Sequence, residues 1–160
     1  MDELRARPAE RLPDLRLPSA PGGVPVPLVP TGGRRVPVIL AVHAAGCADC
    51  GAVAQSLAAA DAELREWDAH VVVVVPGDAE GAARFAEGAG LPFPVVADAE
   101  RKLWMRMGME GAAMIVADPW GEVRMRHVAG AAHDLPSPAE LVDWARFVAM
   151  QCPECEGEAW

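Results

Sequence analysis

A pair of cysteines lies where a buried-type strand pattern gives way to a helical pattern. Val36–Val42 is a continuous apolar run, as expected of a strand covered on both faces of a sheet. Cys47 and Cys50 follow it in a C-x-x-C spacing. From Ala48 to about Trp67 the apolar residues recur at helical spacing. A buried strand that feeds a helix through a cysteine pair restricts the chain to a few α/β architectures.

The rest of the chain predicts further alternation of strands and helices. Aspartates and a Ser/Glu capping box mark helix starts, and glycines mark helix ends. The predicted segments are a strand over His70–Val75, a helix from Asp78 to about Glu87 ended by Gly88 and Gly90, an extended piece over Phe93–Ala97, a helix from Asp98 to about Met107, strands over Ala112–Ala117 and Glu122–Val128, and a last helix capped by Ser137 and Glu140.

This order of elements predicts one α/β domain over residues 36–150. A β-α-β start that feeds a β-β-α end gives a central mixed sheet with helices on both faces. The strands over Val36–Val42 and His70–Val75 should be parallel neighbours or near-neighbours. Residues 1–35 are rich in Pro and Gly and allow at most a short edge hairpin around Val24–Leu28. Residues 151–160 form a C-terminal tail that carries Cys-Pro-Glu-Cys.

Charge and hydropathy exclude some partners. The formal net charge of −9 argues against nucleic acids and anionic membrane surfaces, because both attract a basic face. The sequence has no apolar run long enough for a signal peptide or a transmembrane helix. We therefore expect a cytoplasmic protein. Cysteines in that compartment stay mostly reduced, so a spaced pair indicates redox or metal chemistry rather than a structural disulfide.

The predicted position of the cysteine pair favours thiol–disulfide exchange. Cys47 should lie at the start of the helix, where free backbone N–H groups favour a thiolate. Cys50 lies one turn further on, close enough to form a disulfide with it. We expect Cys47 to be the more exposed and acidic thiol and Cys50 the resolving partner. His43 is a candidate auxiliary group, although a plain strand-end role is the simpler interpretation, and the charge of Asp49 opposes a thiolate.

The sequence resembles the thioredoxin superfamily, and within it the redoxin group that includes the alkyl hydroperoxide reductase/thiol-specific antioxidant (peroxiredoxin-like) proteins. The resemblance runs from about Leu12 to Val148. Its most specific part is Gly90-Leu91-Pro92-Phe93-Pro94-Val95-Val96-Ala97-Asp98, preceded by Phe85. The segments 12–18, 38–50 and 117–124 resemble the opening, the active-site turn and the late hairpin of the family. The resemblance implies a thioredoxin-like fold.

The sequence also departs from the family pattern at the site. Peroxiredoxins carry a threonine three residues before the peroxide-reacting cysteine; here that cysteine would be Cys50, and Cys47 stands in place of the threonine. The arginine near the start of the late strand is absent from residues 110–113. On the thioredoxin side, the cis-proline falls at about Ala113 and the tryptophan before the pair is Gly46. The missing donors weigh against peroxide reduction.

Three functions follow from these observations. The first is a thiol–disulfide oxidoreductase in which Cys47 attacks a substrate disulfide and Cys50 resolves the mixed disulfide. The second is a peroxiredoxin-like peroxidase in which one cysteine forms a sulfenic acid and the other condenses with it. The third is a non-enzymatic redox sensor or zinc-binding protein. The expected partners are a protein or small-molecule disulfide or hydroperoxide and a dithiol reductant, without a cofactor, and a homodimer is a candidate assembly.

The second cysteine pair, Cys152 and Cys155, should lie far from the first. The last helix should start near the active-site edge of the sheet and run about 20 Å away from it. We therefore expect any link between the two pairs to be intermolecular, and Cys47 and Cys50 to keep their redox chemistry without the tail. Two thiolates at this spacing are also candidate zinc ligands, although a tetrahedral site would need a second chain. The alternative to zinc binding is that Cys152 and Cys155 form a local disulfide or stay as two free thiols.

Overall fold

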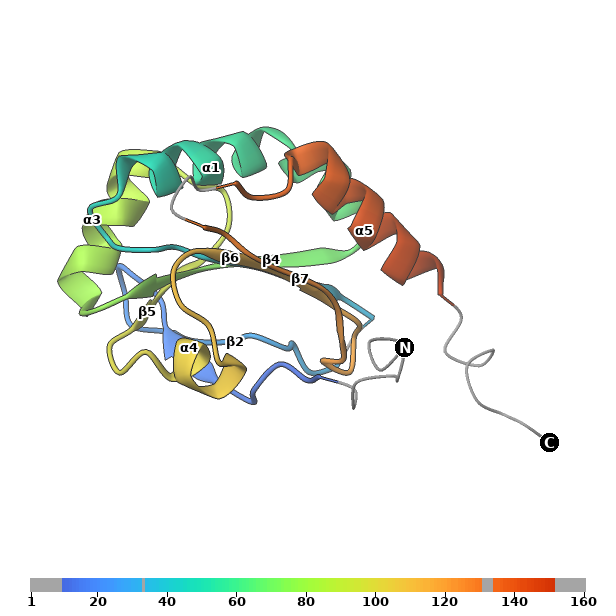
Figure 1. Cartoon of the computed structure of the whole chain (residues 1–160), viewed down its shortest axis with the longest axis horizontal. Helices are drawn as coiled ribbons and strands as arrows, with labels where there is room; N and C mark the ends of the chain where they lie inside the picture. The colour runs from blue at the N-terminus through green and yellow to red at the C-terminus, as the bar shows by residue number, and fades with distance from the viewer. Residues whose placement is uncertain (1–9, 33, 131–133, 152–160) are drawn as a thin grey trace.

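A five-stranded sheet forms the centre of the protein. The computed structural model describes residues 10–32, 34–130 and 134–151 (Figure 1). The strand order is β5-β4-β3-β6-β7, and a separate two-stranded sheet pairs β1 with β2. The bounds are β1 Arg16–Pro18, β2 Pro25–Pro27, β3 Val36–Ala41, β4 Ala69–Pro76, β5 Val95–Asp98, β6 Ala113–Ala117 and β7 Val123–Val128.

The sheet is mixed, as the sequence predicts. Strand β3 pairs in parallel with β4, so that Val38 lies opposite Val71, and β4 pairs in parallel with β5. Strand β6 runs antiparallel to both β3 and β7. Every residue of β3 and of β4 is buried, which is the physical reason for their continuous apolar runs. The carboxyl end of β3 and the end of β7 therefore lie at the same edge of the sheet.

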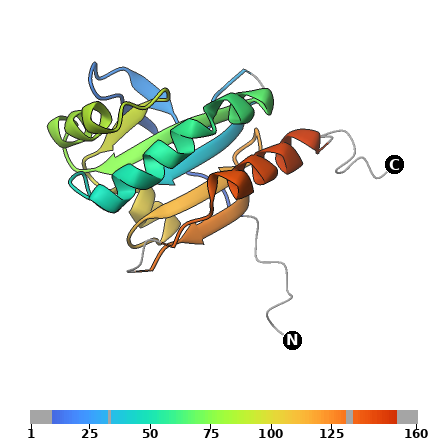
Figure 2. The same cartoon turned by 90° about the horizontal axis from the view of Figure 1, so that it is seen from above.

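Helices cover both faces of this sheet, which confirms the predicted thioredoxin-like architecture. Helices α1 (Ala48–Ala59), α3 (Ala79–Ala89) and α5 (Pro138–Met150) lie on one face, and α4 (Lys102–Met107) lies on the other (Figure 1). Side chains of β3 alternate between the two sides, because Val38 and Leu40 join one core and Ile39 joins the other. Seen from above, α1 and α5 lie side by side across the sheet (Figure 2).

The N-terminal segment completes the core on the α4 side. Strands β1 and β2 form a short antiparallel pair near the predicted hairpin. Four leucines from this segment are buried against β3 to β6 and α4, although Pro and Gly dominate its composition. They are Leu12, Leu15, Leu17 and Leu28.

Two helix predictions were wrong in their bounds. The pattern from Ala48 to Trp67 is broken at Ala60, and a second helix, α2, spans Asp61–Glu66. Leu57 and Leu64 lie on either side of the break and are both buried, so apolar spacing carries no signal of it. Gly88 does not end α3: the helix continues to Ala89, and Gly90 caps it in the left-handed conformation with φ 60°.

The elements around Asp98 also start later than predicted. Strand β5 begins at Val95, after Pro94, which has no N–H to donate to a ladder. Asp98 is the last residue of that strand and is buried. Its carboxylate nevertheless accepts the backbone N–H groups of Lys102 and Leu103, each at 2.9 Å, and so caps α4 from the strand.

Helix α5 carries the chain away from the active-site edge. Ser137 caps its start by accepting the N–H of Glu140 at 3.2 Å, as predicted. At its far end, Gln151 lies in a small hollow with Arg34, which precedes β3, and Trp120, in the turn between β6 and β7. Figures 1 and 2 both place the end of α5 at the opposite end of the molecule from the start of α1.

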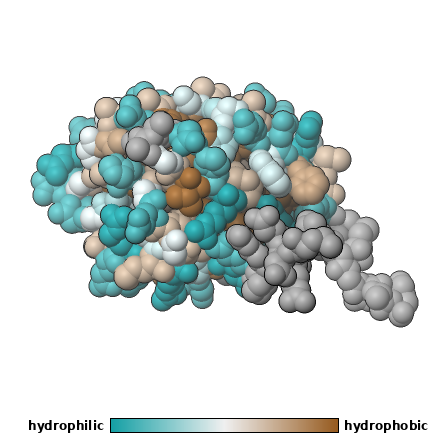
Figure 3. All heavy atoms as spheres, viewed as in Figure 1, coloured by the Kyte–Doolittle hydropathy of each residue, from teal (hydrophilic) through white to brown (hydrophobic). Residues whose placement is uncertain are grey.

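The surface is mostly hydrophilic on the face shown in Figure 3, with small hydrophobic areas between polar side chains. The large exposed apolar side chains include Phe147 and Met150 on α5. Within the part of the chain that the structure describes, no helix is both long and apolar enough to cross a bilayer.

Candidate active site

Cys47 is the N-cap residue of α1, as its place in the sequence predicts. Its backbone is extended, with φ −77° and ψ 112°, and its carbonyl accepts the first helical bond from the N–H of Gly51 at 3.1 Å. The sulfur of Cys47 accepts the N–H of Cys50, with 3.4 Å between Sγ and N. An N-cap position exposes the sulfur to the positive end of the helix dipole, which favours a negative charge on it.

Cys50 lies beneath this turn, in the core between the sheet and α1. Its exposed fraction is 1%, whereas Cys47 is half-buried. The Cys50 sulfur accepts the backbone N–H of His43 at 3.2 Å. The pKa of the Cys50 thiol is raised to about 11, with burial as the largest cause; the His43 N–H lowers it and contacts with Cys47 raise it. Cys50 is therefore held as a neutral thiol next to a more accessible sulfur.

The two auxiliary residues lie on different sides of the pair. Asp49 is exposed in the first turn of α1. His43 is also exposed, and it lines an open depression on the α4 side of the sheet together with Arg101 and Trp104. The backbone N–H of His43 joins this residue to the site, because it donates to the sulfur of Cys50.

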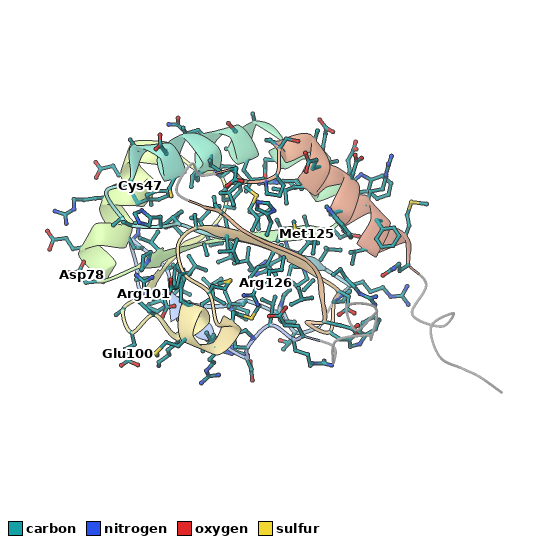
Figure 4. The ribbon with its side chains drawn as sticks, viewed as in Figure 1. Cys47, Asp78, Glu100, Arg101, Met125 and Arg126 are labelled. Atoms are coloured by element: carbon teal, nitrogen blue, oxygen red, sulfur yellow. The ribbon has the colours of Figure 1, made fainter. Side chains whose placement is uncertain are left out.

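Arg101 in that depression has an unusual backbone. Its φ is 52°, in the left-handed region that non-glycine residues rarely adopt. Its guanidinium lies 5.0 Å from the centre of the buried Trp104 ring, a cation–π contact that fixes the side chain. Figure 4 shows Glu100 and Arg101 below the sheet and Cys47 above it, at the same end of the molecule.

A groove between α1 and α3 leads away from Cys47 on the face of the sheet that α1, α3 and α5 cover. We call it the α1–α3 groove. Its lining residues are mostly Gly and Ala, and Arg84 is the charged side chain among them. The residues that line it are Ala45, Gly46, Cys47, Ala48, Gly51, Ala52, Gln55, Arg84, Phe85, Gly88 and Ala89.

Sequence reasoning missed this groove and its arginine. Arg84 lies on the exposed face of α3 beside Glu80, with 3.7 Å between the charged groups, so its pattern is that of any solvated helix. One sequence signal existed: Gly81 in the first turn of α3. An added Cβ there would lie 3.3 Å from the Cβ of Ala45, so glycine lets α3 pack closely against the cysteine turn.

The second cysteine pair and its candidate zinc site lie outside the described residues. Cys152 and Cys155 follow Gln151, the last residue that the structure describes. Among the residues with described positions, no group of three or more His, Cys, Asp or Glu side chains could hold a metal ion. Zinc binding by Cys152 and Cys155 stays a prediction.

The comparison with protein families shows to which family this chain belongs. The sequence profile of the AhpC/TSA family matches residues 8–127, which is most of the chain. This chain belongs to the AhpC/TSA family. The match extends from the N-terminal leucine segment through β7 and includes both Cys47 and Cys50. Membership in this redoxin family supports a thiol redox function for the protein. A search of curated proteins gave no match.

Solved structures confirm the fold of this AhpC/TSA protein. Peroxidoxin BcpB from Mycobacterium tuberculosis is 19% identical, with a TM-score of 0.73, over 90% of this chain and 97% of that one. A structure assigned as thiol:disulfide interchange protein DsbE from Chlorobium tepidum is 21% identical, with a TM-score of 0.72, over 91% and 99% of the two chains. AhpC from Mycobacterium tuberculosis is 15% identical, with a TM-score of 0.73, over 92% and 96%.

Proposed function

We propose that this AhpC/TSA protein is a thiol–disulfide oxidoreductase in which Cys47 is the nucleophile and Cys50 the resolving thiol. The observation that carries the proposal is the contrast between the two sulfurs. Cys47 caps α1 and lines the α1–α3 groove, whereas Cys50 is 1% exposed. A substrate sulfur can therefore approach Cys47 and not Cys50. The names of two similar structures, a peroxidoxin and a thiol:disulfide interchange protein, are consistent with thiol redox chemistry.

The exchange takes two displacement steps. The Cys47 thiolate attacks one sulfur of a substrate disulfide, forms a mixed disulfide and releases the other substrate sulfur as a thiolate. Cys50 then loses its proton, attacks Cys47 Sγ and releases the second substrate sulfur. The substrate gains two electrons, and the protein is left with a Cys47–Cys50 disulfide. The N–H of His43 bonds the Cys50 sulfur and stabilises the thiolate that this second step needs.

A peroxidase is the second candidate, and one observation favours it. The His43 N–H that donates to Cys50 Sγ would also stabilise that sulfur as a peroxide-reacting thiolate. Against it, burial raises the Cys50 pKa to about 11, so little thiolate exists near neutral pH. Cys47 also stands at the threonine position of the peroxiredoxin pattern. The third candidate is a redox sensor without turnover. Its oxidised form would be the same Cys47–Cys50 disulfide.

A single-turnover experiment separates these functions. Reduced protein is mixed in a stopped-flow instrument with bis(2-hydroxyethyl) disulfide or with hydrogen peroxide, and the rate of Cys47–Cys50 disulfide formation is followed by intrinsic fluorescence and mass spectrometry. An oxidoreductase reacts faster with the disulfide and turns over with a dithiol such as dithiothreitol. A faster reaction with peroxide supports the peroxidase instead, and slow oxidation by both supports a sensor.

The proposed partners follow from this chemistry. The substrate is a protein or small-molecule disulfide, and a dithiol reductant returns the pair to its thiol form. We place the reaction in the cytoplasm, where such reductants keep thiols reduced.

A further inference from the structure

Three glycines keep the α1–α3 groove open beside Cys47. Gly46, Gly51 and Gly88 all line the groove, and a Cβ added at any of them would meet no atom within 4 Å. None of them has the left-handed φ that would require glycine. Gly51 and Gly88 lie inside α1 and α3, where glycine weakens a helix. The fold does not need these glycines, and their shared effect is a clear path to the Cys47 sulfur.

The groove has the dimensions of a short extended peptide. It follows α1 from Cys47 to Gln55, eight residues or about 12 Å along the helix axis. An extended chain of about four residues covers that length. Arg84 supplies a positive charge at its α3 wall, and the ion pair that it makes with Glu80 is exposed, with 73% and 79% of the two side chains accessible. An exposed pair of this kind exchanges partners easily.

The chain carries one segment that matches this groove in length, charge and chemistry. Cys152-Pro153-Glu154-Cys155-Glu156 has two thiols three residues apart and two carboxylates, one between the thiols and one directly after them. Cysteine supplies the sulfur that Cys47 reacts with, and glutamate complements Arg84.

This segment cannot reach Cys47 of its own chain. Gln151 lies in a hollow with Arg34, which precedes β3, whereas Cys47 follows β3. The six residues of β3 alone separate those ends by about 17 Å. From Gln151 to Cys155 is four residues, which span about 14 Å at most. The groove of one chain therefore lies beyond the reach of its own tail, and contact between them takes two copies.

We infer that the Cys152–Cys155 tail of a second copy docks in the α1–α3 groove and reduces the Cys47–Cys50 disulfide. This inference rests on the proposed function, because it needs that disulfide as its oxidant. A tail thiolate attacks Cys47 Sγ and displaces Cys50 as a thiolate, which takes a proton. The other tail cysteine then attacks the mixed disulfide and releases Cys47. Two electrons pass from the tail to the site, and the tail leaves as a Cys152–Cys155 disulfide that a dithiol reductant reduces.

Two full-length variants isolate the transfer. One, the acceptor, carries C152S and C155S and is oxidised to the Cys47–Cys50 disulfide. The other, the donor, carries C47S and C50S and is fully reduced. The two are mixed at increasing donor concentration, samples are quenched by alkylation, and mass spectrometry follows the thiols of each variant. The donor should reduce the acceptor in a bimolecular reaction that saturates at high donor concentration and leaves the donor with a Cys152–Cys155 disulfide.

Groove variants of the acceptor test where the tail docks. Gly51→Met and Gly88→Leu place side chains in the groove and should slow the transfer about tenfold or more, equivalent to about 1.4 kcal/mol of binding or activation free energy. Arg84→Glu should slow it most at low salt. Ser56→Leu, on an exposed position of α1 outside the groove, is the matched control and should not change the rate. Reduction of every acceptor by dithiothreitol is measured in parallel, and the transfer from the donor should slow more than this reaction in each groove variant, since the tail needs the whole groove and a small reductant only the sulfur.

Several results would overturn the inference. If the groove variants do not change the rate of transfer, the tail reacts without docking in the groove. No transfer, with a dithiothreitol-reducible acceptor, means that the tail is not a reductant, and zinc bound by the donor would then assign it a metal role. In both cases the proposed function survives. If a model disulfide cannot form the Cys47–Cys50 disulfide in the acceptor at all, the proposed function and the inference fail together.

Discussion

The backbone N–H of His43 points at the sulfur of Cys50, 3.2 Å away. This bond ties the end of β3 to the first turn of α1, so the strand and the helix hold the resolving thiol between them. Burial at this point raises the pKa of Cys50 to about 11. Under the proposed function, the half-buried sulfur of Cys47 at the cap of α1 is then the one that a substrate disulfide meets first.

The first prediction concerns the reactivity of Cys50 alone. In Cys47→Ser, the alkylation rate of Cys50 by iodoacetamide should be very low at pH 8, because burial, the largest cause of the raised pKa of Cys50, remains in this variant. The rate should rise steeply as the pH approaches 11. Cys50→Ser should react faster at pH 8, through Cys47. In urea the two variants should react equally, which controls for intrinsic differences. Faster alkylation of Cys50 at pH 8 in the folded protein would favour the peroxidase.

A second prediction concerns Asp98, which caps α4 from the end of β5. Asp98→Ala should lower the free energy of unfolding by about 2–3 kcal/mol, because it leaves the N–H groups of Lys102 and Leu103 without their charged acceptor. Asp98→Asn keeps one oxygen and should lose less. Asp78→Ala, which removes an exposed cap of α3, should cost about 1 kcal/mol and serves as the control. Equal losses for the two alanine variants in urea titrations would contradict this account.

Much of the fold follows from sequence patterns. The apolar runs of β3 and β4 predict strands buried on both faces, and the aspartates at 78 and 98 predict helix caps, because each pattern reflects a local cause. The break at Ala60 could not be predicted, since Leu57 and Leu64 on either side of it keep the apolar spacing of one helix and are both buried. At the site, the C-x-x-C spacing predicts the pair and its place on the helix. The groove and Arg84 depend on how α3 packs against α1, which no local pattern encodes.

A third prediction concerns the pH dependence of stability. His70 in β4 is buried, and its Nε2 lies 3.0 Å from the carbonyl oxygen of Pro27, so the neutral ring donates this hydrogen bond. Burial lowers the pKa of His70 below its ordinary value of 6.5. The unfolded chain therefore binds a proton more readily, and the stability that the neutral ring contributes, complete above pH 6.5, is lost as the pH falls.

The measurement is the free energy of unfolding at several pH values between 5 and 8. The wild type should lose more stability than His70→Gln as the pH falls, because glutamine can donate to Pro27 without titrating. Identical slopes in the two proteins would show that His70 does not contribute.

A fourth prediction concerns the glycines of the groove. Gly51→Ala and Gly88→Ala should each raise the free energy of unfolding by about 0.5–1 kcal/mol, because alanine favours the helix and its Cβ meets open space. Gly81→Ala is the contrasting variant, since its Cβ would press on Ala45 at 3.3 Å and should gain less or destabilise. Thermal unfolding of the three variants measures this. A loss of stability in the first two would mean that the groove is closed in solution.

The most direct test of the central claim asks which sulfur a substrate disulfide meets first. Reduced Cys50→Ser and Cys47→Ser are each mixed with bis(2-hydroxyethyl) disulfide at pH 7.5, and mass spectrometry follows the mixed disulfide over time. The account predicts rapid formation of a stable mixed disulfide at Cys47 in Cys50→Ser and a reaction of Cys47→Ser that is slower by about tenfold or more, in line with the burial and raised pKa of Cys50. An equally fast or faster reaction at Cys50 would contradict it.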